Sequence, residues 1–387
     1  MQTPTSPVLN SRVMFVCTQT EAGGVQIRAT GMLRALRAEG VEAKLVFLYK
    51  KREIFTDDDG VEVLASKPNG IMNGIFIVLA LWKTMKNFRP TAVVGFAHYS
   101  SPLAAFLGWI TGAKIRIGTQ PGLIKKHNFV ARFTDWLCGV TGIYTSNICT
   151  SNFIREQFSD YPAAYKANLT TVYNGVPLSI SDLTKAEARK RFGLPEAGFF
   201  ILNCGRLSFQ KNQKFLLEVL ERIPDANLAI LGEGELRQDL EREIIERGLI
   251  GRVHLLGELH PSEVMNFLSA GDLFAFPSRW EAFGLAVVEA MNAGLPVISS
   301  DHAVLTEVVA DGGILLPTSD SELWAEQISR LRAAPDKLMR LGVAGQQRSQ
   351  QFSFAAMLAS FKRELNVDLR DPTLGPNHTS IKKNYHA

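Results

Sequence analysis

The chain has 387 residues, of which 46% are hydrophobic and 21% charged. This composition excludes a fibrous or disordered chain, and the length predicts two globular domains. The net charge of +4 is uneven: residues 1–180 hold 19 Lys and Arg against 11 Asp and Glu (+8), and the remainder 23 against 27 (−4). The basic half favours an anionic partner, such as lipid head groups or a diphosphate-bearing acceptor. Nucleic acid is not expected, because no basic stripe is interleaved with aromatic residues.

The first residues, Met1–Ser11, lack the charged segment and apolar core of a signal peptide. The four cysteines lie without CxxC spacing, which is typical of buried free thiols in a reducing compartment. We therefore expect a cytoplasmic protein.

Strands and helices alternate in the first half. A strand over Arg12–Thr18, a glycine turn, a helix over Gln26–Ala38 and a strand over Ala43–Tyr49 form a βαβ unit, which implies a parallel sheet. Further strands are predicted at Ala92–Ala97, Lys114–Gly118, Asn147–Thr150 and Leu169–Tyr173.

The longest apolar run is Ile71–Trp82. It is too short to cross a bilayer, which takes about 20 residues. Two interpretations stay open: a buried core helix or, because Lys83, Lys86 and Arg89 follow, a helix lying in a membrane interface.

The second half repeats the alternation. Its strands are predicted at Gly198–Cys204, Ala226–Leu231, Val253–Leu256, Leu273–Phe276 and Pro296–Ser299. Its helices are predicted at Asn212–Arg222, Leu236–Arg247, Ser262–Ala270 and Gly284–Ala293. The pattern predicts two doubly wound α/β domains, over 1–176 and 177–352, then a helix over 353–367 that can pack back on the first domain, and a disordered tail over 368–387.

Ligands of open α/β sheets bind at the carboxyl ends of the strands, and three such ends in the second half carry distinctive residues. Arg206 and Lys211 follow the strand Gly198–Cys204. The forked guanidinium of an arginine and the mobile ammonium of a lysine together suit a diphosphate. Two solvated cations are the alternative. A glycine-rich turn, Gly-Glu-Gly from Gly232, follows the next strand. Its glycines permit close approach of a ligand, but alone they are weak evidence of a binding site, because tight turns favour glycine.

The third strand end carries two carboxylates around the start of a helix. Glu281 precedes this helix, whose free N–H groups suit a phosphate, and Glu289 interrupts its apolar sequence. A carboxylate in such surroundings needs bonding partners, such as ligand hydroxyls. A structural Glu held by a nearby cation is the alternative.

These motifs resemble the donor-binding domain of family 4 glycosyltransferases of the GT-B fold. The matching segments are NGV at 174–176, GRLSFQK at 205–211, GEG at 232–234, PSRWEAFGLAVVEAMNAGLPVI at 277–298 and the helix after Phe352. The first half matches more loosely, through Gly23-Gly24 and Thr150–Arg155.

The resemblance implies a retaining enzyme of GT-B architecture, two facing Rossmann-like domains with a cleft, that uses a nucleotide-diphosphate sugar without a metal ion or other cofactor. Arg206 and Lys211 would stabilise the leaving diphosphate, and Glu281 would bond the donor sugar. The implied donor-binding residues are Gly23, Gly24, Gly232, Phe283, Gly284, Leu285 and Glu289, the last one at the ribose. No nucleophile is assigned.

One position departs from the family pattern. Family members commonly carry a histidine near the donor sugar, where this chain has Gln120. Gln can donate a hydrogen bond but cannot take up charge. His98, which ends the preceding strand, is another candidate, for the acceptor side.

We therefore expect a hexosyltransferase-type enzyme of cell-surface polysaccharide biosynthesis. It would take a UDP- or GDP-sugar and a glycan or lipid-linked acceptor, with peripheral contact of the basic domain at the inner face of the membrane. The alternatives are the same transfer onto a soluble small molecule and a catalytically impaired nucleotide-sugar-binding protein. A NAD-linked enzyme is disfavoured, because GxGxxG does not follow the first strand.

Overall fold

The computed structural model describes residues 11–21, 23–53, 58–66, 71–123 and 128–366. The chain divides into two compact units. The first unit consists of Met1–Thr119, Phe133–Ser146 and Ala359–Ala387, and the second of Gln120–Arg132 and Asn147–Leu358. Residues 147–176 thus group with the second unit. The tail predicted over 368–387 lies outside the described residues.

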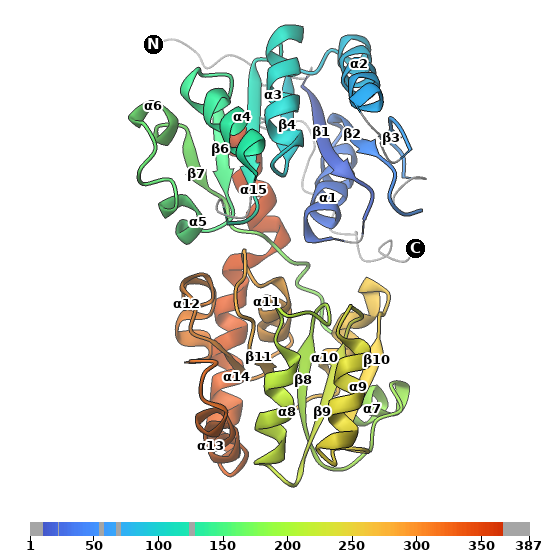
Figure 1. Ribbon diagram of the computed structural model, residues 1–387, viewed down its shortest axis with the longest axis vertical. Coiled ribbons are helices and arrows are strands. Elements are labelled where there is room, and N and C mark those ends of the chain that lie inside the picture. Colours follow the sequence, from blue (N-terminus) through green and yellow to red (C-terminus); the bar gives the residue numbers. More distant parts are fainter. Residues whose placement is uncertain (1–10, 22, 54–57, 67–70, 124–127, 367–387) are drawn as a thin grey trace, which may run out of the picture. The chain divides into compact units, whose positions relative to one another are not determined.

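A parallel sheet is built from the first part of the chain, in the order β3-β2-β1-β4-β5-β6-β7 (Figure 1). Its strands are β1 (Arg12–Gln19), β2 (Glu42–Tyr49), β3 (Val61–Val63), β4 (Ala92–Phe96), β5 (Ile115–Gln120), β6 (Ser146–Cys149) and β7 (Leu169–Thr171). Its helices are α1 (Gly24–Ala38), α2 (Ile71–Phe88), α3 (Ser100–Thr111), α4 (Phe129–Val140), α5 (Asn152–Glu156) and α6 (Ala163–Lys166). Val13 to Cys17 of β1 are fully buried, as expected for a central parallel strand covered on both faces.

The second sheet is also parallel, in the order β10-β9-β8-β11-β12-β13. Its strands are β8 (Phe199–Cys204), β9 (Ala226–Leu231), β10 (Val253–Gly257), β11 (Leu273–Phe276), β12 (Val297–Ser300) and β13 (Ile314–Leu316). Its helices are α7 (Lys185–Arg191), α8 (Gln213–Glu221), α9 (Arg237–Glu246), α10 (Val264–Leu268), α11 (Leu285–Asn292), α12 (Ala303–Val309), α13 (Ser321–Arg332) and α14 (Pro335–Ser349).

Two apolar layers cover the two faces of the second sheet. Alternate residues of β8 serve opposite layers, because side chains of a strand alternate in direction. Ile201 packs in the layer that includes Trp324 of α13, and Phe200 and Leu202 pack in the layer that includes Met291 of α11. The predicted doubly wound sheets are confirmed.

Most predicted elements form within a residue or two of their expected bounds. One helix differs: the segment expected to be helical over Ser262–Ala270 is a 3₁₀ turn at Pro261–Glu263 followed by α10. Pro261 occupies the first position of this turn, where its missing N–H costs no hydrogen bond, and the His260 side chain accepts from the Ser262 N–H.

The C-terminal helix α15 (Phe354–Glu364) begins in the second unit and ends in the first. In the second unit, Val176 bridges Ser353, and a Cβ on Gly175 would lie 2.5 Å from the Ser353 carbonyl oxygen. This close approach is a structural reason for the NGV motif. In the first unit, Phe361 lies 6.4 Å from Phe96 between ring centroids.

Helix α2 is longer than the apolar run that predicted it, and it is only half buried. Ile77, Leu81 and Met85 are buried, whereas Phe76 and Leu79 are more than half exposed. The interpretation as a buried core helix therefore holds for one face of α2 only. Within the described part of the chain, we find no helix with the length and apolarity needed to cross a membrane.

Candidate active site

The candidate site lies where the strand order of the second sheet reverses. From β8 the chain proceeds outward through β9 to β10, and from β11 it proceeds in the other direction through β12 to β13. The carboxyl ends of β8 and β11 therefore flank the switch point at which doubly wound sheets bind ligands. The loop that begins at Gly205 and the loop that begins at Pro277 leave these two ends.

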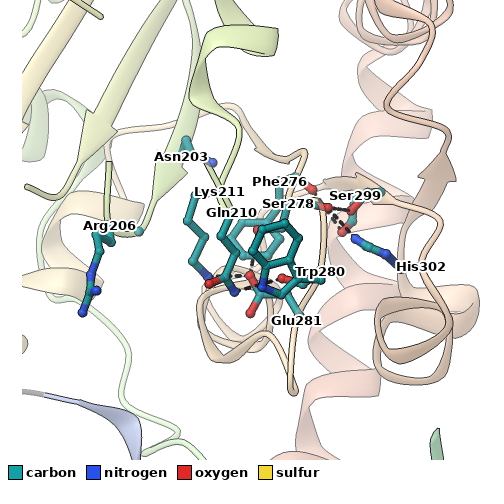
Figure 2. A network of polar contacts seen from close by, with 12 residues as sticks. Asn203, Arg206, Gln210, Lys211, Phe276, Ser278, Trp280, Glu281, Ser299 and His302 are labelled. Carbon is teal, nitrogen blue, oxygen red and sulfur yellow. Dashed lines mark hydrogen bonds and ion pairs between the residues drawn. The ribbon is translucent and has the colours of Figure 1, made fainter. Parts of the chain in front are cut away.

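An ion pair connects the two loops. Lys211 Nζ lies 2.5 Å from Glu281 Oε1, and the two side chains are 19% and 8% exposed. Ser278 Oγ donates to the same oxygen at 2.7 Å. Nζ also lies 4.7 Å from the centroid of the Phe276 ring. Figure 2 shows the pair at the centre of a polar network. The structure thus brings together a cation and a carboxylate separated by 70 residues in the sequence.

Hydrogen bonds between the same loops hold the pair in place. Asn212 Nδ2 donates to the Pro277 carbonyl at 3.3 Å, and Arg279 Nη2 donates to Asn212 Oδ1 at 3.0 Å. The Arg279 N–H donates to the Gln210 carbonyl at 2.8 Å, and Gln210 Nε2 donates to the Trp280 carbonyl at 2.9 Å. Asn212 adopts φ 57°, a left-handed conformation that asparagine tolerates better than most residues.

Arg206 is exposed on the β8–α8 loop. Figure 2 shows its guanidinium apart from Lys211 and Glu281. Its position depends on Gly232, because a Cβ there would lie 2.1 Å from the Gly205 carbonyl oxygen. The structure therefore gives Gly232 a packing role between two strand ends, beside the predicted role in donor binding.

Glu289 of α11 lies close to the end of β8. Burial raises its pKa from 4.5 to about 7. Burial and the Glu289 charge raise the pKa of Cys204, the last residue of β8, to about 12, which Lys211 partly opposes. The Glu289 side chain is partly exposed, and no side chain of the described residues donates a hydrogen bond to its carboxylate. Above that pKa, a ligand hydroxyl would meet a carboxylate acceptor here.

Helix α11 begins at the same edge. Gly284 precedes it with φ 93°, and a Cβ there would lie 2.7 Å from Leu305 Cδ2. Leu285 is its first residue. The buried Phe283 ring packs 5.4 Å from the Phe352 ring between centroids, so this side chain is structural. Only the backbone groups of these three residues are suited to a phosphate.

Two residues that the sequence did not single out support the Glu281 loop. His302 Nε2 lies 2.6 Å from the Ser278 carbonyl oxygen, and Ser300 Oγ donates to that oxygen at 2.7 Å. Because a carbonyl only accepts, His302 carries a proton on Nε2. No sequence signal pointed to His302, because its contact with Ser278 forms only where β12 ends beside β11. Figure 2 shows His302 beside Ser278.

The predicted residues of the first sheet also lie at strand ends. Gly23 and Gly24 start α1 after β1, and His98 follows β4 in the turn before α3. Gln120 ends β5, is 3% exposed and donates to Asn147 Oδ1 at 3.3 Å. Its amide therefore belongs to a buried polar network.

The fold is that of the GT-B glycosyltransferases. HepE of Anabaena, crystallised with UDP and glucose, aligns over 92% of this chain and 100% of its own, with a TM-score of 0.80 at 19% identity. Sucrose-phosphate synthase of Thermosynechococcus elongatus aligns over 92% of this chain and 98% of its own, with a TM-score of 0.75 at 20% identity.

Two family models match consecutive parts of the sequence. Residues 22–180 match the model described as Glycosyltransferase Family 4, and residues 184–348 match Glycosyl transferases group 1. Because the two matches together cover most of the chain, it belongs to the family 4 glycosyltransferases. The resemblance stated from the motifs is confirmed.

The D-inositol 3-phosphate glycosyltransferase of Corynebacterium efficiens is a curated relative. It is 25% identical over 312 residues, which cover 66% of this chain and 74% of the relative. With some other relatives the match spans about half of their length. One is the alpha-D-kanosaminyltransferase of Streptomyces kanamyceticus, which is 28% identical over 48% of this chain and 51% of its own.

Proposed function

We propose that the protein is a retaining glycosyltransferase that moves a sugar from a UDP- or GDP-sugar onto a glycan or lipid-linked acceptor of cell-surface polysaccharide biosynthesis. The observation that carries the proposal is the Lys211–Glu281 ion pair at the switch point of the second sheet, 2.5 Å between Nζ and Oε1. The complex of HepE with UDP and glucose supports a nucleotide-sugar donor in a protein of the same fold.

In this proposal the ion pair opens when the donor binds. A diphosphate carries more negative charge than a carboxylate and competes for Lys211. Glu281, released from Lys211 but still bonded to Ser278, then accepts hydrogen bonds from the donor sugar. Lys211 and Arg206 together neutralise the departing diphosphate, so neither a metal ion nor a cofactor is required.

Two further groups complete the proposed donor site. Glu289 accepts from the ribose hydroxyls, since its carboxylate receives no side-chain hydrogen bond within the described part of the protein. Backbone N–H groups at the start of α11 bind the phosphates. No nucleophile is assigned, because retention by front-side attack requires none.

The acceptor is proposed as lipid-linked, reached from the cytoplasm at the inner face of the membrane. A soluble acceptor is the second candidate, favoured by the relative named as a D-inositol 3-phosphate glycosyltransferase. A third candidate is a catalytically impaired nucleotide-sugar-binding protein, favoured by Gln120, which stands where the family commonly has histidine and whose amide is held by Asn147.

A thermal-shift screen against UDP, GDP, ADP and their sugar conjugates, with and without EDTA, tests the donor site. A ligand that binds only the folded protein raises the melting temperature. We expect a shift with UDP or GDP that EDTA does not change. A shift that EDTA abolishes would contradict the metal-independent site, and no shift with any nucleotide would contradict the donor site itself.

Turnover then separates the enzyme from the impaired binder. Wild-type protein is incubated with the nucleotide sugar identified by the screen, and released nucleoside diphosphate is measured with an inositol phosphate or a polyprenyl-diphosphate sugar as acceptor. We expect release to rise with the lipid-linked acceptor. A rise only with the soluble acceptor supports the second candidate, and binding without turnover supports the third.

A further inference from the structure

Helix α2 presents apolar side chains on two opposite faces. Ile77, Leu81 and Met85 pack into the first sheet's core. The outward side chains recur at intervals of three and four residues, so they lie in one stripe along the helix. They are between 37% and 76% exposed: Met72, Ile75, Phe76, Leu79 and Trp82. A helix that covers a sheet in water normally places polar residues on this outer face.

Two neighbouring helices extend the apolar stripe. The helices α2 and α3 pack against each other, and Cys138 of α4 lies 3.9 Å from the Pro102 carbonyl oxygen of α3. Because the three crossovers from β3 through β6 progress in one direction along the sheet and such connections are right-handed, the helices cover the same face. Their exposed apolar residues in the first unit are Phe106, Trp109, Ile110, Phe133 and Leu137.

The exposed charges of this surface are positive. Lys83 and Lys86 continue the outward stripe of α2 towards its C-terminus. Lys86 Nζ lies 4.5 Å from the centroid of the Trp82 ring. Asp135 is the single acidic residue in the sequences of the three helices, and it is buried, accepting a hydrogen bond from Tyr144 at 3.0 Å.

We infer that this surface, formed by the exposed residues named on α2, α3 and α4, docks on an anionic lipid bilayer. Apolar and tryptophan side chains flanked by lysines suit the boundary between head groups and acyl chains. The positive charges complement anionic head groups. A second copy of the chain fits less well, because self-association would bring like charges together without exposed carboxylates to pair with them.

The inference does not rest on the proposed function, although docking would bring the enzyme to a lipid-linked acceptor. It is tested by vesicle flotation of the full chain, with phosphatidylcholine alone or with one part phosphatidylglycerol in four. The apolar variant is Phe76→Ser/Leu79→Ser/Trp109→Ser. The charge variant is Lys83→Gln/Lys86→Gln.

A matched control changes apolar residues that are equally exposed in the second unit. Ile245 is 64% exposed and Ile250 is 69% exposed, so Ile245→Ser/Ile250→Ser removes comparable surface elsewhere. The thermal shift with nucleotide is measured for every variant. It reports on folding and on the donor site in the second unit, which none of the surface substitutions touches.

We expect wild-type protein and the control to float with the mixed vesicles at low salt. The charge variant should bind roughly 30-fold more weakly, and the apolar variant should lose binding even at low salt. Equal binding by wild type and apolar variant, or no wild-type binding, would overturn the inference. A dimer in light scattering that the apolar variant dissolves, without vesicle binding, would assign the surface to a second copy instead. Vesicle binding without any nucleotide shift would leave the inference standing and refute the proposed donor site.

Discussion

The pKa of Glu289 makes its role testable by pH. Burial raises this pKa to about 7, against 4.5 for an ordinary glutamate. The folded protein therefore holds a proton on Glu289 between these two values, whereas the unfolded chain does not. Stabilisation from this proton is complete below about pH 4.5 and is lost as the pH rises through about 7.

The size of the effect follows from the shift. The difference between the two pKa values corresponds to about 3 kcal/mol in the free energy of unfolding. Because the side chain is partly exposed, we expect about 2 kcal/mol. Glu289→Gln removes the titration and keeps the shape. We expect the variant to be only slightly more stable than wild type at pH 5 and about 2 kcal/mol more stable at pH 8, or roughly 4–8 °C in melting temperature.

Nucleotide affinity should rise with pH, whereas the stabilisation from the Glu289 proton falls. Ribose hydroxyls donate to a carboxylate more strongly than to a neutral acid or amide. Wild-type affinity for the nucleoside diphosphate found by the screen should therefore rise between pH 6 and pH 8, and Glu289→Gln should weaken binding by about 2 kcal/mol at pH 8, or roughly 30-fold.

Urea unfolding and calorimetry at pH 5, 6, 7 and 8 measure both effects. Glu243, another glutamate of the same unit, lies 2.6 Å from Lys214, and Glu243→Gln is the control for loss of one carboxylate. Equal pH dependence of stability in wild type and Glu289→Gln would refute the assignment of the proton to Glu289. Unchanged nucleotide affinity would refute the ribose role alone.

Two further predictions concern the loops around the ion pair. Lys211→Met leaves the 8% exposed Glu281 without its cation, so we expect a loss of about 2 kcal/mol in urea unfolding, largely restored by adding Glu281→Gln. We also expect a kcat at least about 100-fold lower with a smaller change in donor affinity. Loss of affinity with unchanged kcat would contradict this role of Lys211. Gly232→Ala places a Cβ against the Gly205 carbonyl and should lower the free energy of unfolding in urea by about 2–4 kcal/mol. The control Gly248→Ala should lose about 1 kcal/mol, because Gly248 has a positive φ but open space around it. Equal losses would show that φ alone matters.

The strands of the second sheet, and the two strand ends that carry the site, could be predicted from the sequence for a physical reason. A strand covered on both faces is a short apolar run, and β8 and β11 are both of this kind. Each is followed by polar residues that a buried strand would not tolerate. Local pattern therefore located both strand ends that carry the site, and the family models agree with the resemblance seen there.

The pairing of Lys211 with Glu281 could not be predicted in the same way. It depends on β8 and β11 being neighbours, although β9 and β10 lie between them in the sequence. No local pattern encodes that order. The sequence did not predict that His302 supports the Glu281 loop, for the same reason: this contact requires the end of β12 to lie beside β11.

Helix α2 shows a different limit of sequence reasoning. An apolar run predicts burial, yet periodicity cannot say what covers each face. Here the spacing of Ile77, Leu81 and Met85 fits the sheet, and the spacing of Ile75 and Leu79 fits nothing in the described part of the unit, since both are at least half exposed. One stripe of apolar residues is enough to fold this helix onto its sheet. The second stripe adds nothing to that packing, and Lys83 and Lys86 continue it along the helix. Vesicle flotation therefore tests whether a lipid surface covers this stripe.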